Sequence, residues 1–330
     1  MTNMLEPEIS VIIPLYNRGP YIARALKSVL NQTIQNFEII VVDSSTDNGT
    51  RIVREFDDSR ILLIQQKKCG VSAARNYGVE VARAEMISFL DADDEWMPDH
   101  LSALLRLQKK HPNAGAYGTA CLIDDGSQRH IALYSDDIPK EPWEGLLPSY
   151  FRAAALGFPP IVTSMAAIPK GIFSEMEGFS ITTWWGEDSD LWGRIAFDYP
   201  IAFSWNGMGI YHTDAINRAC NETKPIEENI FVHTAMKAMN DGKVSSNMQR
   251  DLLEYVARKQ IETAFHNIRA GERILAQANL RKCETKEFVL QKDLALFLAF
   301  SPKIVYVILK NIRRILFKAY GQIHNNRNDY

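Results

Sequence analysis

The sequence has few cysteines, and no two of them lie close together. Its four cysteines, Cys69, Cys121, Cys220 and Cys283, form no CxxC motif. This spacing argues against a zinc site or a disulfide framework and favours a reducing compartment. The sequence also lacks a basic excess, because 37 lysines and arginines stand against 40 aspartates and glutamates, giving a formal net charge of −3. We therefore expect no nucleic-acid partner.

Long hydrophobic runs are missing as well. No apolar run approaches the roughly 18 residues of a membrane span, and lysines and arginines interrupt the nearest candidate, residues 294–320. The N-terminal stretch MTNMLEPEIS is polar and acidic, unlike a signal peptide. With 46% hydrophobic and 23% charged residues over 330 positions, the sequence predicts a globular protein of one large or two smaller domains. We expect a cytoplasmic location, at the inner face of the cell membrane if the protein binds lipid.

What the sequence does contain is a regular alternation of two hydrophobic periods over its first 111 residues. Short β-branched runs predict strands, and segments with helical spacing separate them. Such alternation is typical of βαβ units and a largely parallel sheet. The predicted strands lie at 9–16, 37–45, 60–66 and 85–90, and the predicted helices at 19–32, 47–56, 71–84 and 98–111. Further on, strands are predicted at 114–123 and 158–168, a helix at 184–197, two short strands within 201–213, and mainly helices from about Pro225.

Polar residues follow three of the predicted strands. Asn17, Asp43 and Asp91 fall at strand ends, which is where open α/β sheets bind their ligands. In the stretch FLDADDEWM, Asp91 and Asp93 lie two residues apart. Hard divalent cations such as Mg²⁺ and Mn²⁺ prefer carboxylate oxygens together with substrate phosphates. The alternative is a polar loop that caps the helix beginning near Pro98.

The ordered set of motifs resembles glycosyltransferase family 2. These motifs are ISVIIPLYN, SVLNQT, FEIIVVDSSTDNGT, GVSAARNYGVEVARAEMISFLDADD and WWGEDSDLWGRI, within residues 8–213. The resemblance implies an α/β GT-A fold, which is a Rossmann-like, mainly parallel sheet flanked by helices, with a C-terminal helical region. The change to a mainly helical pattern places a domain boundary near residues 218–226, between a catalytic domain at 1–220 and a helical domain at 221–330. The resemblance also implies an inverting, metal-dependent hexosyltransferase that uses a nucleotide-sugar donor, with UDP expected, and Mn²⁺ or Mg²⁺. The expected acceptor is a glycan or lipid-linked glycan in polysaccharide or cell-surface glycan biosynthesis.

The resemblance also assigns roles to individual residues. Asp93 and Asp91 match the metal-binding motif, and His212 stands where relatives supply a further metal or diphosphate contact. Asp188 matches the general base, and its neighbour Glu187 completes the acidic pair. The residues assigned to the nucleotide-sugar are Pro14, Tyr16, Asn17, Asp43, Arg75, Asp91 and Ala92.

One departure from the family pattern concerns the nucleotide. After strand two the family commonly has DDGSTD, whereas this chain has DSSTDNGT, so Ser44 replaces an acid and Ser45 a glycine. Asp43 is retained, so nucleotide binding is compatible with the sequence, while the base preference is left open.

Each assignment has a structural alternative. Asp43, Glu187 and Asp188 could cap helices, Arg75 could be a surface residue, and His212 could be a buried histidine that binds no metal. The tryptophans Trp184, Trp185 and Trp192 could belong to the core or form an acceptor platform. The alternative functions are a nucleotidylyltransferase, which usually has a glycine-rich basic loop after strand one, and a non-catalytic sugar-nucleotide-binding module.

The C-terminal residues 304–319 have an apolar helical stripe with a basic flank. The stripe comprises Ile304, Val305, Ile308, Leu309, Ile312, Ile315, Leu316 and Ala319, and the flank comprises Lys303, Lys310, Arg313, Arg314 and Lys318. A basic amphipathic helix can bind an anionic membrane surface. Packing on the protein's own surface and a contact in a homo-oligomer are the alternatives.

Overall fold

A computed structural model describes residues 6–67, 70–215, 218, 221–302 and 305–306. A single mixed sheet runs through the molecule, in the order β3-β2-β1-β4-β9-β6-β10-β5, with β7 beside β6 and β8 beside β10. Its strands are β1 (Ile9–Leu15), β2 (Phe37–Asp43), β3 (Ile61–Gln65), β4 (Met86–Phe89), β5 (Glu95–Trp96), β6 (Ala116–Asp124), β7 (Arg129–Ile131), β8 (Glu144–Leu146), β9 (Ala166–Pro169) and β10 (Ile201–His212).

The first four strands form the parallel half of the sheet that the alternating sequence predicts. β1 pairs in parallel with both β2 and β4, and β2 pairs in parallel with β3. Every residue from Ile9 to Ile13 is buried, as expected for a central strand that is covered on both faces. β9 then runs antiparallel between β4 and β6, so the sheet is mainly but not wholly parallel.

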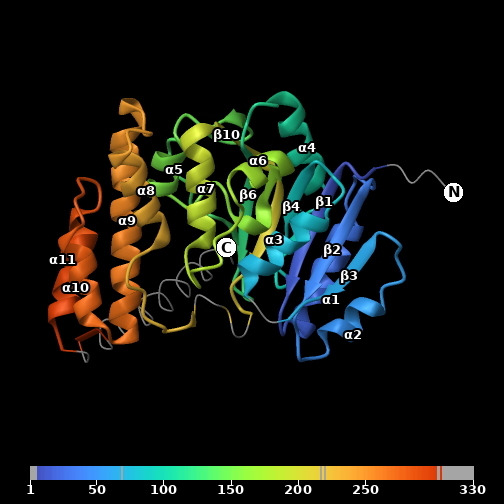
Figure 1. Cartoon of the computed structure of the whole chain (residues 1–330), viewed down its shortest axis with the longest axis horizontal. Helices are drawn as coiled ribbons and strands as arrows, with labels where there is room; N and C mark the ends of the chain where they lie inside the picture. Colours follow the sequence, from blue (N-terminus) through green and yellow to red (C-terminus); the bar gives the residue numbers. More distant parts are fainter. Residues whose placement is uncertain (1–5, 68–69, 216–217, 219–220, 303–304, 307–330) are drawn as a thin grey trace, which may run out of the picture.

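Helices cover both faces of the sheet (Figure 1). The helices of the described residues are α1 (Gly19–Leu30), α2 (Gly49–Arg54), α3 (Val71–Val81), α4 (His100–Lys110), α5 (Tyr150–Leu156), the 3₁₀ turn η1 (Thr163–Met165), α6 (Lys170–Glu175), α7 (Glu187–Asp198), α8 (Ile230–Asn240), α9 (Ser246–Ala270), α10 (Arg273–Arg281) and α11 (Val289–Phe300).

Alternate residues of β1 enter two different hydrophobic cores. Val11 and Ile13 pack with α1 and α4 on one face, while Ile12 packs on the other face with α3, α5, α7, α8 and the first part of α9. The helix α3 lies very close to the sheet, because a Cβ placed on Gly78 would come within 2.4 Å of the Ile12 side chain. This close packing fixes Arg75, one turn earlier on α3, near the end of β4.

The C-terminal helices are divided between two clusters. Phe231 of α8 and Tyr255 of α9 belong to the core around Trp192, whereas the second half of α9 packs with α10 and α11 in a cluster of its own. Figure 1 shows α10 and α11 at the end of the molecule opposite β3 and α2. The domain division at residues 220 and 221 stays a prediction. Most of the predicted basic helix at 304–319 lies outside the described residues.

Two local predictions differ from the structure. The segment 201–213 forms one strand, β10, in place of two. The pairing register shifts between Ser204 and Gly209, a stretch that contains Gly207 with φ at +72°, as in a β-bulge. The predicted strand at 158–168 contributes only its last residues to β9, after the turn η1. Of the helices that the structure describes, none combines the length and apolar character needed to cross a membrane.

Candidate active site

The ends of β1, β2 and β4 lie side by side. Leu15, the last residue of β1, pairs with Asp43, the last residue of β2, and Ile12 pairs with Phe89, the last residue of β4. Because these strands are parallel, the residues that follow them emerge at the same edge of the sheet. This edge therefore carries Asn17, Asp43 and Asp91, as the sequence predicts.

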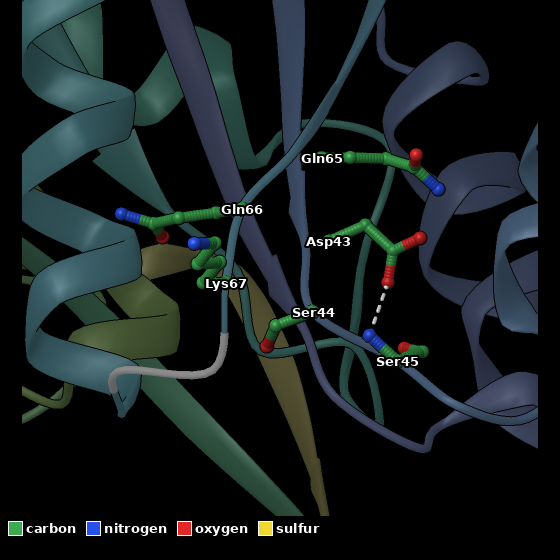
Figure 2. A pocket seen from close by; sticks show the side chains of 6 residues that line it. All are labelled: Asp43, Ser44, Ser45, Gln65, Gln66 and Lys67. Atoms are coloured by element: carbon green, nitrogen blue, oxygen red, sulfur yellow. Dashed lines mark hydrogen bonds between the residues drawn. The ribbon is translucent and has the colours of Figure 1, made fainter.

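A cavity of about 320 Å³ opens beside the end of β2. Figure 2 shows its lining side chains, which come from the ends of β2 and β3, namely Asp43, Ser44, Ser45, Gln65, Gln66 and Lys67. Asp43 accepts the backbone N–H of Ser45 at 2.8 Å on one oxygen and the hydroxyl of Thr50 on the other. Each carboxylate oxygen can accept more than one hydrogen bond, so Asp43 retains acceptor capacity toward a ligand N–H.

The other residues assigned to the nucleotide at β1 do not line this cavity. Pro14 is part of β1, and Tyr16 is 41% exposed. Asn17 has a left-handed backbone with φ at +51° and holds the neighbouring loop. Its N–H donates to the hydroxyl of Ser45 at 3.0 Å, and its side-chain oxygen accepts the N–H of Thr46 at 2.8 Å. Ser45, where the sequence departs from the family pattern, thus contributes a hydroxyl to the loop.

The acidic cluster after β4 is held by arginines. Asp91 accepts from Arg75 at 2.6 Å, and Asp93 lies 3.2 Å from the Nε of Arg18. Arg24 donates to the backbone carbonyl of Asp93. Burial and the charge of Asp91 raise the pKa of Asp93, although Arg18 opposes this shift. Ala92, between the two acids, is buried in the core on the α1 side.

Asp94 is an acidic residue whose role the sequence does not reveal. It is buried, and one of its oxygens accepts the backbone N–H of His212 at 3.0 Å. Its other oxygen is also buried from solvent. Burial, together with the charges of Asp91 and Asp93, raises the pKa of Asp94 well above its usual value. Such an excess of buried acid is the electrostatic setting that a bound cation relieves.

These donors fit a hard divalent cation. Asp91 and Asp93 supply carboxylate oxygens, while in the part of the chain that the structure describes no three His, Cys, Asp or Glu side chains converge on a common metal position. Mg²⁺ commonly takes only one or two protein carboxylates and completes its shell with water and substrate phosphates. The arrangement suits a cation that enters together with a phosphate-bearing ligand.

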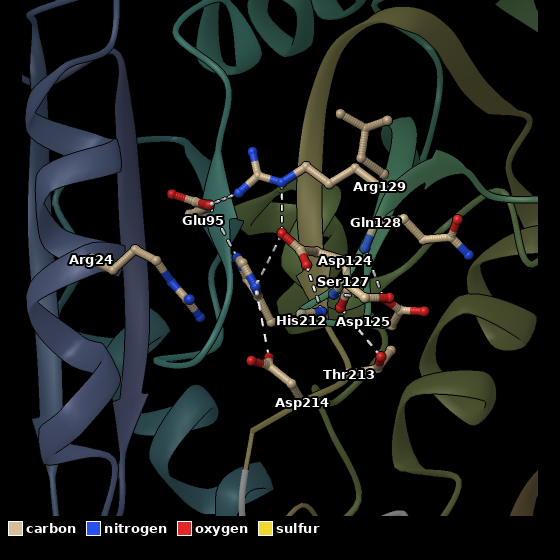
Figure 3. Close-up of polar contacts among 12 residues, drawn as sticks. Arg24, Glu95, Asp124, Asp125, Ser127, Gln128, Arg129, His212, Thr213 and Asp214 are labelled. Carbon is tan, nitrogen blue, oxygen red and sulfur yellow. Dashed lines mark hydrogen bonds and ion pairs between the residues drawn. The ribbon is translucent and has the colours of Figure 1, made fainter. Parts of the chain in front are cut away.

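His212, at the end of β10, lies in a polar network beside this cluster (Figure 3). Its Nε2 is 3.0 Å from Glu95, and its Nδ1 is 3.8 Å from Asp124 and 4.0 Å from Asp214. The hydrogen bond with His212 lowers the pKa of Glu95. The backbone of His212 therefore contacts the acidic loop through Asp94, while its ring contacts Glu95. The assignment of His212 to the metal stays a prediction.

Glu187 and Asp188 begin the helix α7. Gly186, directly before them, has φ at +83°, a conformation that favours glycine. Glu187 lies 3.3 Å from Arg75, so one guanidinium joins it to Asp91 across the site. Burial and the charge of Asp188 raise the pKa of Glu187 to about 7. Burial disfavours the charge on Arg75, but Asp91 and Glu187 hold the pKa of Arg75 above its usual value.

Two residues near Asp188 were not identified from the sequence. Lys259 of α9 is buried beside Glu262 at 3.1 Å. Burial opposes its charge, while Glu262, Tyr255 and Asp188 raise its pKa. Tyr150 of α5 is also buried, and burial followed by the charges of Tyr255 and Asp188 raises its pKa well above the usual value. A single lysine within a helical pattern carries no sequence signal that separates it from surface lysines.

The three tryptophans of the predicted site divide into two groups. Trp192 is 1% exposed and packs in the core, where its Nε1 lies 3.4 Å from the hydroxyl of Thr163. Trp184 and Trp185 are partly exposed and contact each other and His266 of α9. The core explanation therefore holds for Trp192.

Comparison with known proteins agrees with this architecture. Residues 10–175 match the profile of Glycosyl transferase family 2. The chain is 36% identical over 121 residues to the E. coli protein WfgD, which is named a UDP-Glc:alpha-D-GlcNAc-diphosphoundecaprenol beta-1,3-glucosyltransferase. The aligned region covers 36% of this chain and 48% of WfgD. Among solved structures, S. aureus TarS residues 1–349 in complex with UDP-GlcNAc has a TM-score of 0.62 at 16% identity, covering 82% of this chain and 88% of that chain.

A second solved structure has a similar fold. The mannosyltransferase PcManGT from Pyrobaculum calidifontis, in complex with GDP-Man and Mn²⁺, has a TM-score of 0.59 at 20% identity, covering 93% of this chain and 84% of that chain. The fold is thus that of the GT-A glycosyltransferases, as the sequence predicts. The chain belongs to glycosyl transferase family 2. It matches less than half of the length of the curated relatives with which it aligns.

Proposed function

We propose that this chain is an inverting glycosyltransferase that moves a hexose from a nucleotide-sugar donor to a glycan or lipid-linked glycan. The observation that carries the proposal is the position of Arg75 between Asp91 and Glu187. This contact brings the acidic cluster after β4 and the acidic start of α7 into one site. A displacement at a sugar carbon needs one group for the departing diphosphate and another for the attacking hydroxyl.

The donor side is assigned to the edge of β1, β2 and β4. Asp43 lines the cavity beside β2 and has acceptor capacity for an N–H of a nucleobase, which uracil offers. The name of WfgD and the ligand of TarS both contain a UDP-sugar, whereas PcManGT holds GDP-Man. We take UDP as the nucleotide. Mn²⁺ or Mg²⁺ on Asp93 and Asp91 would stabilise charge on the leaving diphosphate.

The acceptor side is assigned to the start of α7. A sugar hydroxyl is a weak nucleophile until its proton is removed, and a positioned carboxylate can accept that proton. We assign this role to Asp188. Glu187 is held by Arg75 at 3.3 Å, so its role is to fix the start of α7 against the donor side.

The cellular role follows from the same chemistry. WfgD is named for a diphosphoundecaprenol-linked acceptor, which supports an acceptor of this class and a role in polysaccharide or cell-surface glycan synthesis. We place the protein in the cytoplasm, at the inner face of the membrane where lipid-linked acceptors are reached, with homo-oligomer formation left as an alternative use of the C-terminal segment.

A donor screen tests the proposed function. Purified protein is incubated with UDP-, GDP- and dTDP-sugars, with and without Mn²⁺, and both nucleoside diphosphate and pyrophosphate are measured. We expect Mn²⁺-dependent release of UDP. Formation of pyrophosphate from a sugar phosphate and UTP would indicate a nucleotidylyltransferase. Tight UDP binding without turnover of any sugar would indicate a non-catalytic binding module.

A further inference from the structure

Trp184 and Trp185 form a pair of aromatic rings directly before Gly186 and the acidic start of α7. Their ring centroids lie 5.6 Å apart, and both side chains are partly exposed, unlike Trp192 in the core. Exposing part of two large aromatic rings gives up hydrophobic stabilisation. Partly exposed tryptophans beside a reacting group are therefore suited to contact a ligand.

The ring of His266, on α9, packs against both tryptophan rings. Its ring centroid is 5.6 Å from that of Trp184 and 5.3 Å from that of Trp185. Its Nε2 lies 2.6 Å from the carbonyl of Lys224, and its Nδ1 lies 3.1 Å from a guanidinium nitrogen of Arg269. A carbonyl only accepts and a guanidinium only donates, so Nε2 carries the proton and Nδ1 is the acceptor. Burial lowers the pKa of His266, which agrees with this neutral form.

Helix α9 also carries a buried lysine, Lys259, that interacts electrostatically with the candidate base. Lys259 lies seven residues before His266, which is close to two helical turns, so the two side chains share a face. Lys259 is within electrostatic reach of Asp188. The side-chain amide of Asn229, directly before α8, packs closely against Gly186. A Cβ placed on Gly186 would come within 2.8 Å of this amide. Helices α8 and α9 thus border the loop that carries the tryptophans and Asp188.

We propose that Trp184 and Trp185 form the binding subsite for the acceptor sugar, and that His266 is the positioning residue that holds them. This inference rests on the proposed function. The C–H face of a sugar ring is apolar and packs on an aromatic face, while its hydroxyls stay free for polar contacts. A ring stacked on this pair lies next to the start of α7, where Asp188 can accept the proton of the reacting hydroxyl. The C-terminal helical segment thereby takes part in acceptor selection.

The test separates acceptor binding from donor chemistry. The probes are the methyl α- and β-glycosides of glucose, galactose and N-acetylglucosamine, titrated into protein saturated with UDP and Mn²⁺ while tryptophan fluorescence is recorded. We expect at least one glycoside to change the fluorescence and to serve as an acceptor. Trp185→Ala and Trp184→Ala should each raise KM for that glycoside at least tenfold. UDP affinity and slow donor hydrolysis by water should stay within twofold of the parent.

His266 is tested by a pair of variants. His266→Ala should raise KM for the acceptor, and His266→Phe, which restores an aromatic ring against the tryptophans, should recover part of the loss. A merely structural role would lower kcat and UDP affinity together. Phe297→Ala is the matched control, because Phe297 of α11 is an aromatic residue that is 58% exposed and lies outside the site. Circular dichroism identifies any variant that fails to fold. If Trp185→Ala does not fold, Trp185→Phe replaces it, and the expected rise in KM for the acceptor is smaller.

Two outcomes would overturn the subsite while leaving the proposed function in place. One is normal donor hydrolysis with an unchanged acceptor KM in both tryptophan variants. The other is the absence of a fluorescence change with every glycoside in a protein that hydrolyses a UDP-sugar. If the unmodified protein neither binds UDP nor hydrolyses any nucleotide-sugar, the proposed function itself is wrong.

Discussion

The guanidinium of Arg75 lies 2.6 Å from the carboxylate of Asp91 and 3.3 Å from that of Glu187. Arg75 is buried on α3, whereas 32% of the Asp91 side chain and 14% of the Glu187 side chain are exposed, so solvent screens the contact only in part. It connects the end of β4 to the start of α7, two elements that are far apart in the sequence. The relative position of the two acidic groups therefore depends on one cation.

Replacing Arg75 tests this dependence. Arg75→Gln leaves Asp91 and Glu187 facing each other without a compensating charge, which costs about 3 kcal/mol of unfolding free energy. We expect this loss in urea denaturation, together with a large fall in sugar transfer. Arg106→Gln is the matched control, because Arg106 makes a more exposed ion pair with Glu144. If Arg75→Gln lost no more unfolding free energy than Arg106→Gln, the two acidic groups would not depend on Arg75 for their position.

The metal assignment predicts a specific defect at Asp93. Asp93→Asn keeps the size of the side chain but removes the charge that would hold a cation, so Mn²⁺-dependent donor turnover should be abolished while the fold is kept. Turnover against Mn²⁺ concentration is the measurement. Asp99→Asn, at an exposed acid directly before α4, should behave like the parent. Full activity with an unchanged metal requirement in Asp93→Asn would rule out this ligand.

The proton acceptor is tested at Asp188. Asp188→Asn preserves the shape but cannot take a proton, so transfer should fall by roughly 10²–10⁴-fold. Calorimetry should show near-normal UDP affinity, because the cavity beside Asp43 is formed by other residues. Glu187→Gln should lose less transfer. If reduced UDP binding accounts for the whole defect of Asp188→Asn, then Asp188 is not the base.

The raised pKa of Glu187 predicts how stability depends on pH. Its ordinary pKa is 4.5 and its pKa in the fold is about 7, so between these values the folded state binds more protons than the unfolded state. The unfolding free energy must therefore fall as pH rises through this window. The glutamine in Glu187→Gln does not ionise. The fall in the variant's unfolding free energy between pH 5 and pH 8 should therefore be smaller than the parent's fall by roughly 1–3 kcal/mol.

Urea denaturation in a metal-free, chelator-containing buffer provides the measurement. Glu80→Gln, at an exposed position of α3, should reproduce the parent's pH dependence. Parallel curves for Glu187→Gln and the parent would show that Glu187 ionises normally in the fold.

The C-terminal segment predicts binding to an anionic surface. Removal of the chain from Lys303 onward deletes the apolar stripe together with its basic flank, Lys303, Lys310, Arg313, Arg314 and Lys318. Flotation with vesicles that contain anionic lipid should show reduced binding for the truncated protein, and added salt should weaken binding of the full chain. The matched full-length variant is the triple substitution Lys310→Ser, Arg313→Ser and Arg314→Ser, which removes basic charge without shortening the chain. Absence of vesicle binding by the full chain at low salt would rule out the membrane role. The remaining roles for the segment would then be packing on the protein's own surface or a contact in a homo-oligomer.

The sequence predicts the parallel half of the fold well because each of its strands is a short apolar run followed by a helix with a clear 3.6-residue period. Such local patterns are set by burial on two faces. The antiparallel strand β9, inserted between β4 and β6, was not placed by the same reasoning. Its neighbours are determined by long-range pairing, which no local period encodes.

The candidate site divides in the same way. Asp43, Asp91 and Asp93 could be placed from the sequence because they directly follow strands whose ends meet at one edge. Tyr150, Lys259 and His266 could not, because their approach to the start of α7 depends on how α5 and α9 pack. The partner of Arg75 was also unpredictable, since its side chain bridges two distant segments.

The packing of the C-terminal helices has a consequence for protein engineering. Phe231 of α8 and Tyr255 of α9 contact Phe151 of α5 within the core that also holds Trp192. A chimera that joins the first part of this chain to the helices of a relative at residue 220 would pair two mismatched halves of that core. We expect such chimeras to fold only when the core positions of α5 and α7 are exchanged with α8 and α9, so a change of acceptor by segment exchange must transplant both sides of the interface.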